Sequence, residues 1–392
     1  MVGTIGYAAI IYKYRIQMGD FGDFTKAGKM IWENVDPYSR LMYVNSPVSA
    51  VIVFGLNKAL PFIFIPAFWQ LVNLLGLAFF IRTIISRDYH RVLPAVFAIF
   101  AFLNVTRALF ANVQVTGMVL GLIAIGITLF RNGKSTFISM LPIWFALELK
   151  PQLAIGFIAI FLFQGKIQKL RIFALGIYVV ISHSIVELKF AGDINFLWIE
   201  KLLKYSSGSL KEGYEISFWK VIAIHFNHVP IVRLGSLFAI IIILISIVMT
   251  ALKDKTQWAI YLAMISPILN SYLHLYDLAF ISLCFLMGML VHGEPKFLIA
   301  TFALLTIFPL TLTGQLLSFC ILSTFIFLSV QLKNIREKYM KFTLLAFLLS
   351  VLATQWLKNE SQELQMGEVL VLPVMLILIL TRKQIVRMFN SI

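Results

Sequence analysis

The sequence predicts an all-α, polytopic transmembrane protein with about 11 to 14 membrane helices. Three observations predict this class. Of the 392 residues, 60% are apolar and only 13% are charged, whereas a soluble domain is about half apolar and about a quarter charged. The apolar residues form long runs, not the short alternating segments of a membrane β-barrel. The basic residues gather in short loops between these runs.

Up to fourteen apolar runs follow one another along the chain. They cover residues 2–14, 62–84, 92–109, 113–130, 135–149, 152–164, 171–188, 231–251, 257–271, 276–292, 296–312, 315–333, 340–357 and 368–381. The first is short, because a span needs about 20 residues. Either that helix continues past Tyr14, or the printed start lies inside the true first helix. With no repeat, linker or cleavable signal peptide visible, the sequence predicts a single domain over residues 1–392.

The formal charge of +15 reflects membrane topology and not a nucleic-acid surface. Alternate loops between the runs hold 18 of the 33 lysines and arginines but only four of the 18 acidic residues. The positive-inside rule therefore places these loops, and both termini, in the cytoplasm. Lys13 and Arg15 are exceptions to this rule, because the predicted topology places them at the outer end of the first run.

The two cysteines, Cys284 and Cys320, lie inside apolar runs and are predicted to be packing residues. The sequence contains no phosphate-binding glycine loop, no HExxH and no CxxC motif, and its first two aspartates have the spacing D-x-x-D and not D-x-D. We therefore expect neither a metal nor another cofactor.

Two pairs of short runs are predicted to be broken helices. The first pair is interrupted at Leu149-Lys150-Pro151, because proline disfavours a helical residue before it. The second is interrupted in SPILNSYLHLYD, before residue 278. Non-helical backbone is tolerated at membrane depth where it is buried in protein or lines a water-filled cavity. Both breaks fall on the outer side.

Two outer loops are predicted, at residues 15–61 and 189–230. The second contains FLWIEKLLKY and SFWKVIAIHF, whose spacing suggests interfacial helices. The first outer loop and the two helix breaks are therefore expected to converge on one face of the molecule.

Four carboxylates, Asp20, Asp23, Glu33 and Asp36, lie in the polar segment from Met18 to Ser49. Asp20 or Asp23 could act as a general base that accepts a proton from a hydroxyl group. The alternative for Asp23 is a helix N-cap, because FTKAGKMIW follows it. Asp36, before Pro37, is predicted to be a turn residue.

Two cations are candidates for binding a phosphate at the headgroup level, namely Arg107 and Lys150. The alternative for both is a side chain that snorkels from a helix end. Glu148 stands beside Lys150 and could simply pair with it.

A second group of candidates could hold a sugar or a phosphate, namely His274, Tyr276 and Asp277 at the second break, and Gln114. The alternatives are a helix cap for Asp277, a structural hydrogen bond for His274, and satisfaction of the backbone by Gln114.

Four segments of the chain resemble those of a known family. They are DFGDFTKAGKMIWENVDPY, MYVNSPVSAVIV, ANVQVTGMVLGL followed by ALELKPQLAIGF, and SPILNSYLHLYD. In their order and outer placement they are similar to the polyprenyl-phosphate-sugar-dependent membrane glycosyltransferases of the GT-C superfamily. More narrowly, they resemble glycosyltransferase family 87, a bacterial family that includes polyprenol-phosphate-mannose-dependent mannosyltransferases.

This resemblance implies a GT-C-like fold in a bacterial inner membrane and an inverting transfer of a hexose, mannose-like, to a lipid or glycan acceptor. The family's catalytic aspartate falls on Asp20, with Asp23 in reserve. Polyprenyl phosphate would leave with Arg107, Lys150 or His274 stabilising its charge. The implied partners are the polyprenyl-phosphate sugar, the acceptor and membrane lipids.

Two other classes remain open. One is a lipid or solute transporter or flippase, for which broken helices and internal repeats are typical. The other is a polysaccharide polymerase, a class that tends to use arginines in its large outer loop, where this chain has Arg40.

Overall fold

The computed structural model describes residues 19–41, 45–60, 65–100, 109, 114–165, 167–190, 192–206, 218–219, 229–269, 275–292 and 362–390. The predicted runs at residues 2–14, 296–312, 315–333 and 340–357 lie outside these residues. Apart from an isolated antiparallel bridge between Ile85 and Phe389, the described residues contain no β structure. The prediction of an all-α chain is confirmed for this part.

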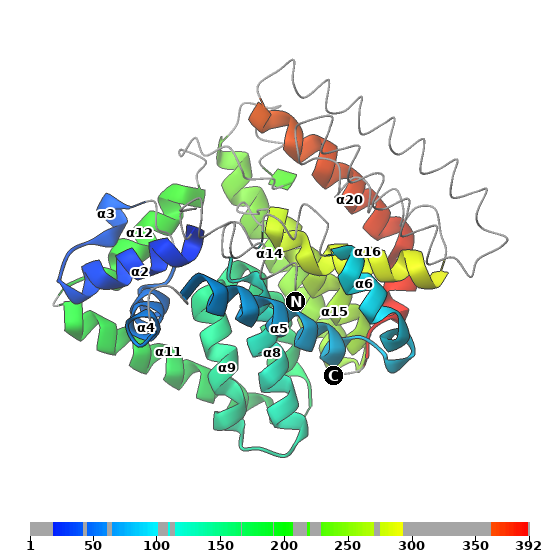
Figure 1. The fold of residues 1–392 in the computed structure, drawn as a ribbon, viewed down its shortest axis with the longest axis horizontal. Helices are drawn as coiled ribbons and strands as arrows, with labels where there is room; N and C mark the ends of the chain where they lie inside the picture. The colour runs from blue at the N-terminus through cyan, green and yellow to red at the C-terminus, as the bar shows by residue number, and fades with distance from the viewer. Residues whose placement is uncertain are drawn as a thin grey trace.

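The helices follow the predicted runs closely. They are α2 (Gly19–Trp32), α3 (Pro37–Arg40), α4 (Pro47–Lys58), α5 (Ile65–Ile84), η2 (Arg87–Val92), α6 (Leu93–Phe100), α8 (Thr116–Arg131), α9 (Thr136–Leu149), α10 (Pro151–Phe163), α11 (Gln168–Phe190), α12 (Ile194–Ser206), α14 (Val229–Leu252), α15 (Thr256–Ile265), η3 (Ser266–Leu269), η4 (Leu275–Leu278), α16 (Ala279–His292) and α20 (Gln362–Arg387). Figure 1 shows α2, α3, α4 and α12 gathered at one end of the molecule, and α6, α15, α16 and α20 at the other.

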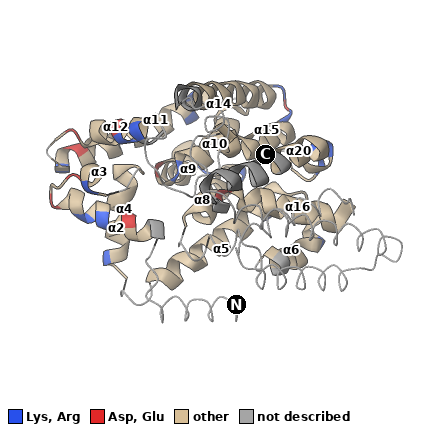
Figure 2. Cartoon of the chain, turned by 90° about the horizontal axis from the view of Figure 1, so that it is seen from above, with Lys and Arg blue, Asp and Glu red and all other residues tan. Residues whose placement is uncertain are grey.

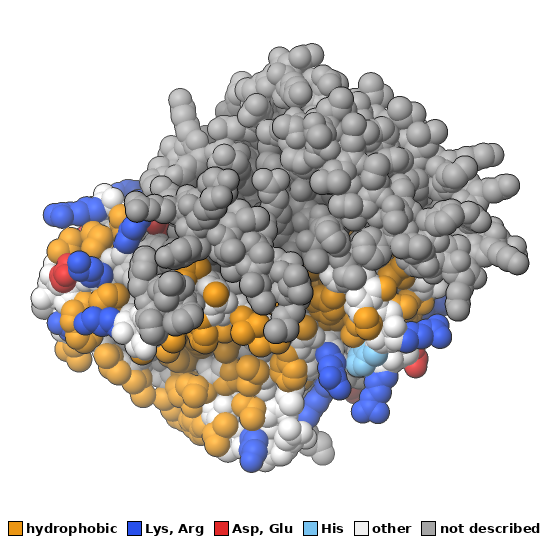
Figure 3. All heavy atoms as spheres, in the orientation of Figure 1, with side chains coloured by type: hydrophobic (Ala, Val, Ile, Leu, Met, Phe, Trp, Pro, Cys, Tyr) orange, Lys and Arg blue, Asp and Glu red, His pale blue; other side chains and the backbone are white. Residues whose placement is uncertain are grey.

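Three of the described helices are long and apolar enough to span a membrane: Ile65–Ile84, Gln168–Phe190 and Leu234–Leu252. Six shorter apolar helices accompany them, so the described residues do not reach the predicted number of spans. Large apolar side chains of α11 and α14 point away from the protein, and Figure 3 shows such side chains over much of the described surface in view. Figure 2 shows Lys, Arg, Asp and Glu concentrated near α2, α3 and α12. These surfaces suit a membrane protein.

The described residues of the predicted outer loop at residues 15–61 are largely helical, in α2, α3 and α4. In α2, Phe21, Phe24, Ala27 and Ile31 are all fully buried. Their spacing of three or four residues places them on one helix face, despite the polar residues between them. The helix α4 begins at Pro47, and the Ser46 hydroxyl caps it by accepting a hydrogen bond from the Val48 amide.

Asp36 and α12 agree with their predictions. The Asp36 carboxylate accepts a hydrogen bond from the Tyr38 amide at 2.8 Å, as expected for a turn and cap residue. The segment FLWIEKLLKY lies within α12, where Ile194 is buried and Phe196 and Leu203 are exposed. Of SFWKVIAIHF, the structure describes Phe218 and Trp219.

The helices α5 and α8 approach each other closely. A Cβ atom at Gly121 would lie 2.4 Å from Gly76 Cα, and one at Gly117 would lie 2.2 Å from the Asn73 carbonyl oxygen. The spacing Gly117-x-x-x-Gly121 is the small-residue pattern that allows helix backbones to approach in membranes. Asn73 Oδ1 also accepts a hydrogen bond from the Met118 amide at 3.0 Å, which satisfies one free donor at the start of α8.

The close approach of α5 and α8 yields a first prediction. Gly121→Ala should destabilise the protein by about 1–3 kcal/mol, because the added methyl group meets backbone that cannot move aside. Gly176→Ala is the matched control, since no atom lies within 4 Å of its added Cβ in α11. Thermal unfolding of both full-length variants in detergent measures the difference. Equal melting temperatures would contradict the packing described.

Candidate functional site

Both predicted helix breaks are present. At the first, Lys150 separates α9 from α10 with φ −157° and ψ 80°, which is extended and not helical. At the second, α15 ends at Ile265 and η3 and η4 lie on either side of residues 270–274, which are outside the described residues. The α-helices are therefore interrupted at two points, by Lys150 at the first and by the 3₁₀ turns η3 and η4 at the second.

Side chains from the two breaks meet in a buried ion pair. Lys150 Nζ lies 2.5 Å from Asp277 Oδ1, and the two side chains are 3% and 1% exposed. The Thr116 hydroxyl, at the start of α8, donates a hydrogen bond to the same carboxylate oxygen at 3.1 Å. The end of α9 and the starts of α8 and α16 are thus joined at one polar cluster, which we call the break cluster.

Gln114 lies two residues before Thr116 in the sequence. Its side chain is 1% exposed, and its Oε1 atom is buried without a hydrogen-bond donor. A buried acceptor with no donor is unfavourable, by about 1–3 kcal/mol. Gln114 therefore presents an acceptor that a hydroxyl group of a ligand could satisfy.

A chain of contacts joins the start of α2 to the break cluster. The Phe21 ring stacks on Trp69, with ring centres 4.3 Å apart. One helical turn further, Asn73 donates to the Trp69 carbonyl and accepts from Met118, two residues after Thr116. Asp20 precedes Phe21 in the first turn of α2, and its side chain lies outside the described part of the chain.

Asp23 is not the N-cap of α2, because the helix already begins at Gly19. The capping interpretation required the helix to begin just after Asp23. The helix instead includes Phe21, which is buried like Phe24. Burial raises the pKa of the Asp23 carboxyl group above its ordinary value, and the nearby Lys26 partly opposes this shift. A raised pKa brings a carboxylate closer to the value that suits a general base at neutral pH.

The other predicted site residues are placed only in part. Tyr276 belongs to η4 and directly precedes Asp277. Arg107 and His274 lie outside the described residues. Among the residues that are described, no three His, Cys, Asp or Glu side chains lie close enough together to hold a metal ion.

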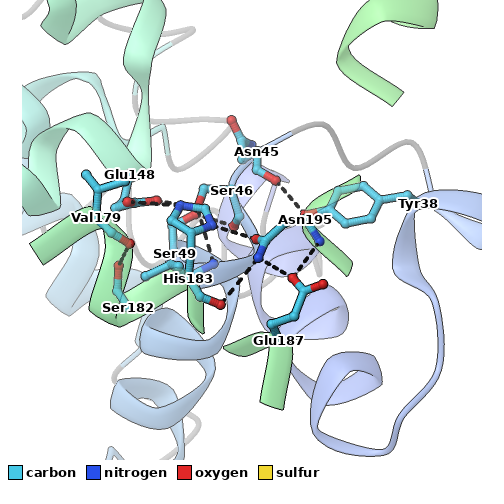
Figure 4. A network of polar contacts seen from close by, with 11 residues as sticks. Tyr38, Asn45, Ser46, Ser49, Glu148, Val179, Ser182, His183, Glu187 and Asn195 are labelled. Atoms are coloured by element: carbon cyan, nitrogen blue, oxygen red, sulfur yellow. Dashed lines mark hydrogen bonds and ion pairs between the residues drawn. The ribbon is translucent and has the colours of Figure 1, made fainter. Parts of the chain in front are cut away.

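A second polar network lies beside the break cluster and was not predicted (Figure 4). Glu148 accepts a hydrogen bond from the Ser46 hydroxyl, and its other oxygen lies 3.2 Å from His183 Nε2. His183 Nδ1 lies 2.6 Å from Asn195 Oδ1. Asn195 in turn donates to a Glu187 carboxylate oxygen from both its side-chain Nδ2 and its backbone N–H group. The alternative in which Glu148 pairs with Lys150 is wrong, because Lys150 pairs with Asp277.

A sequence signal for this network did exist. Glu148, His183 and Glu187 are ionisable residues inside or at the end of apolar runs, and such residues are rare in membrane segments without a partner. The identity of their partners could not be read from the sequence, since Ser46 and Glu148 are separated by 102 positions.

Comparison with protein-family models, with curated proteins and with solved structures found no match for this chain. The resemblance to glycosyltransferase family 87 therefore stays a prediction, and function has to be argued from the site.

The break cluster yields a prediction on stability. Lys150→Met should destabilise the protein by about 3–5 kcal/mol, because it leaves the Asp277 carboxylate buried without its cation. The double variant Lys150→Met/Asp277→Leu should recover much of this loss. Lys29→Met is the control, since the Lys29–Glu33 pair is 63% and 53% exposed and should contribute less than about 1 kcal/mol. Additive losses in chemical unfolding would contradict a coupled pair.

Asp23 yields a prediction on pH. A carboxyl group whose folded pKa is raised makes the folded state bind the proton more tightly, so stability should fall as pH rises from about 3.8 through the raised pKa. Asp23→Asn should abolish this fall and be at least as stable as the wild type at neutral pH. Melting temperatures across the acidic range measure it, with the exposed Glu33→Gln as control. A destabilised Asp23→Asn at neutral pH would argue against burial as the cause.

Proposed function

We propose that this protein is a membrane glycosyltransferase. It transfers a hexose, mannose-like, from a polyprenyl-phosphate donor to a lipid or glycan acceptor at the outer face of the membrane, with inversion. The proposal includes a GT-C-like fold in a bacterial inner membrane with both termini in the cytoplasm. The observation that carries it is the contact chain from the first turn of α2, which contains Asp20, to the break cluster.

The donor requires an apolar path for its long chain and a polar site for its head group. The exposed apolar faces of α11 and α14 suit the first requirement. The break cluster suits the second, because polar groups collect there at the ends of apolar helices. Transporters share broken helices, but nothing in the described residues favours transport over transfer.

The reaction follows from the groups available. Asp20 accepts the proton of the acceptor hydroxyl, and that oxygen attacks the anomeric carbon while the bond to the phosphate oxygen breaks. Polyprenyl phosphate leaves with the electron pair of that bond, and Asp20 later releases the proton to water. Asp23 is the reserve base. No metal is needed, since a phosphate is already a stable leaving group.

The sugar and the phosphate are held by different residues in this proposal. The Lys150–Asp277 pair is electrically neutral and offers both a donor and an acceptor, which suits sugar hydroxyls. Gln114 Oε1 accepts a further hydroxyl, and Tyr276 lies next to Asp277. Stabilising the phosphate falls to Arg107 and His274.

The test is transfer by the purified full-length protein. Polyprenyl-phosphate mannose, glucose, galactose and arabinose are offered in turn, with membrane lipid extract as acceptor. Asp20→Asn should lower the rate with the productive donor by at least about 100-fold, as expected for loss of a general base. Glu33→Gln, at an exposed carboxylate just after α2, is the matched control and should change the rate by much less.

Two outcomes would overturn the proposal. Unchanged transfer by Asp20→Asn would remove Asp20 as the base. If the wild type transferred sugar from none of these donors but moved polyprenyl-phosphate sugar between the leaflets of vesicles, the protein would be a flippase.

A further inference from the structure

We infer that Glu148 and His183 form a buried proton-binding site, in which one shared proton holds together the ends of α4, α9, α11 and α12. This inference concerns the network of Figure 4 and does not depend on the proposed function. It follows from counting the hydrogens that the observed contacts require.

The orientation of Asn195 fixes the hydrogen on one side of the imidazole ring. Asn195 Nδ2 donates to a Glu187 carboxylate oxygen and, at 3.3 Å, to the His183 carbonyl oxygen. The opposite amide orientation would place an oxygen against both of these acceptors. Asn195 Oδ1 therefore faces His183 Nδ1 at 2.6 Å as an acceptor, so Nδ1 carries a hydrogen.

The other side of the ring then lacks a hydrogen. With Nδ1 protonated, a neutral imidazole has only a lone pair on Nε2, and this atom lies 3.2 Å from Glu148 Oε1. A carboxylate oxygen also offers only lone pairs. The Ser46 hydroxyl is directed at the other oxygen of Glu148 and cannot supply the hydrogen. The contact therefore needs one additional proton, carried by either His183 or Glu148.

Burial alone disfavours a charged imidazolium, but the contacts of His183 with Glu148 and Asn195 and the charges of Glu148 and Glu187 outweigh this effect and make loss of the proton unfavourable. Glu148 is 3% exposed and His183 is 16% exposed. Among the described residues, the charged groups that face His183 are two carboxylates, Glu148 from α9 and Glu187 from α11 itself. The groups contributed by α12 are uncharged, namely Asn195 and the Trp198 ring that stacks on the imidazole at 5.5 Å, as is Ser46 at the start of α4. Without the shared proton, two buried acceptors face each other beside a second carboxylate.

The proton links the docking of these helix ends to pH. In the unfolded chain, glutamate and histidine titrate near their ordinary pKa values of about 4.3 and about 6.5. Between these values both states hold the proton, and the contribution of the pair to stability is fully present. Above about pH 6.5 only the folded state keeps it, so the ratio of folded to unfolded protein should fall up to about tenfold per pH unit.

Glu148→Gln tests this inference. The glutamine amide donates to neutral His183 Nε2 and its oxygen accepts from Ser46, so every contact is retained without the extra proton. The melting temperature of the full-length wild type in detergent should fall between about pH 6.5 and about pH 8.5, and that of Glu148→Gln should fall less. Glu200→Gln is the control, since this carboxylate is 43% exposed, and it should follow the wild type. Equal slopes for wild type and Glu148→Gln would overturn the inference.

A second measurement uses the wild type alone and is decisive even if Glu148→Gln does not fold. Over the same pH interval, amide hydrogen exchange is measured and corrected for its intrinsic pH dependence. Protection should fall in α12 and in the C-terminal half of α11, while the α5–α8 contact stays protected. Unchanged protection in α12, or an equal loss in α5 and α8, would overturn the inference.

Discussion

Lys150 carries its charge at a point where the apolar chain stops being helical, and a charge in such a place is tolerated only with a partner. The partner, Asp277, lies 127 positions away and at the start of another interrupted helix. Because both side chains are buried, neither break can shift without separating the charges. This ion pair and the Thr116 hydroxyl that supports it therefore help to fix the end of α9 and the starts of α8 and α16 relative to one another.

Glu148 stands two residues before Lys150 and is committed to a different part of the chain. Its carboxylate meets the N-terminal end of α4 through Ser46, where a helix dipole favours a negative charge. Two opposite charges thus lie near the break after α9. Lys150 binds Asp277 just before α16. Glu148 binds Ser46 at the start of α4 and His183 in α11, and His183 in turn contacts Asn195 in α12. The group of helices that includes α2 is positioned by these contacts and by the α2–α4 packing, in which the Gly28 position lies against the Ala50 carbonyl oxygen.

Local signals in the sequence predicted much of this arrangement. The apolar runs gave α5, α8 to α11 and α14 to α16, and Lys150-Pro151 gave the first break because proline acts on its nearest neighbours. A helix after Asp23 was considered, but its start was placed too late, since the buried residues of α2 alternate with charged ones over only fourteen positions. The partners of Glu148 were missed because pairing across a fold depends on tertiary packing, which no short-range pattern encodes.

The two polar groups satisfy their charges in ways that suggest different tasks. In the Glu148 network each side-chain hydrogen is assigned to a contact, and the contact between His183 and Glu148 requires one proton more. The break cluster differs, because Gln114, two residues before Thr116 in the sequence, has a buried Oε1 atom without a donor. A neutral ion pair next to an unsatisfied acceptor is better suited to a hydroxyl-rich group than to an anion, which would have to compete with Asp277 for Lys150. The two clusters therefore differ physically: the Glu148 network is completed by a proton, whereas the chain just before Thr116 of the break cluster carries a buried acceptor that no described group satisfies.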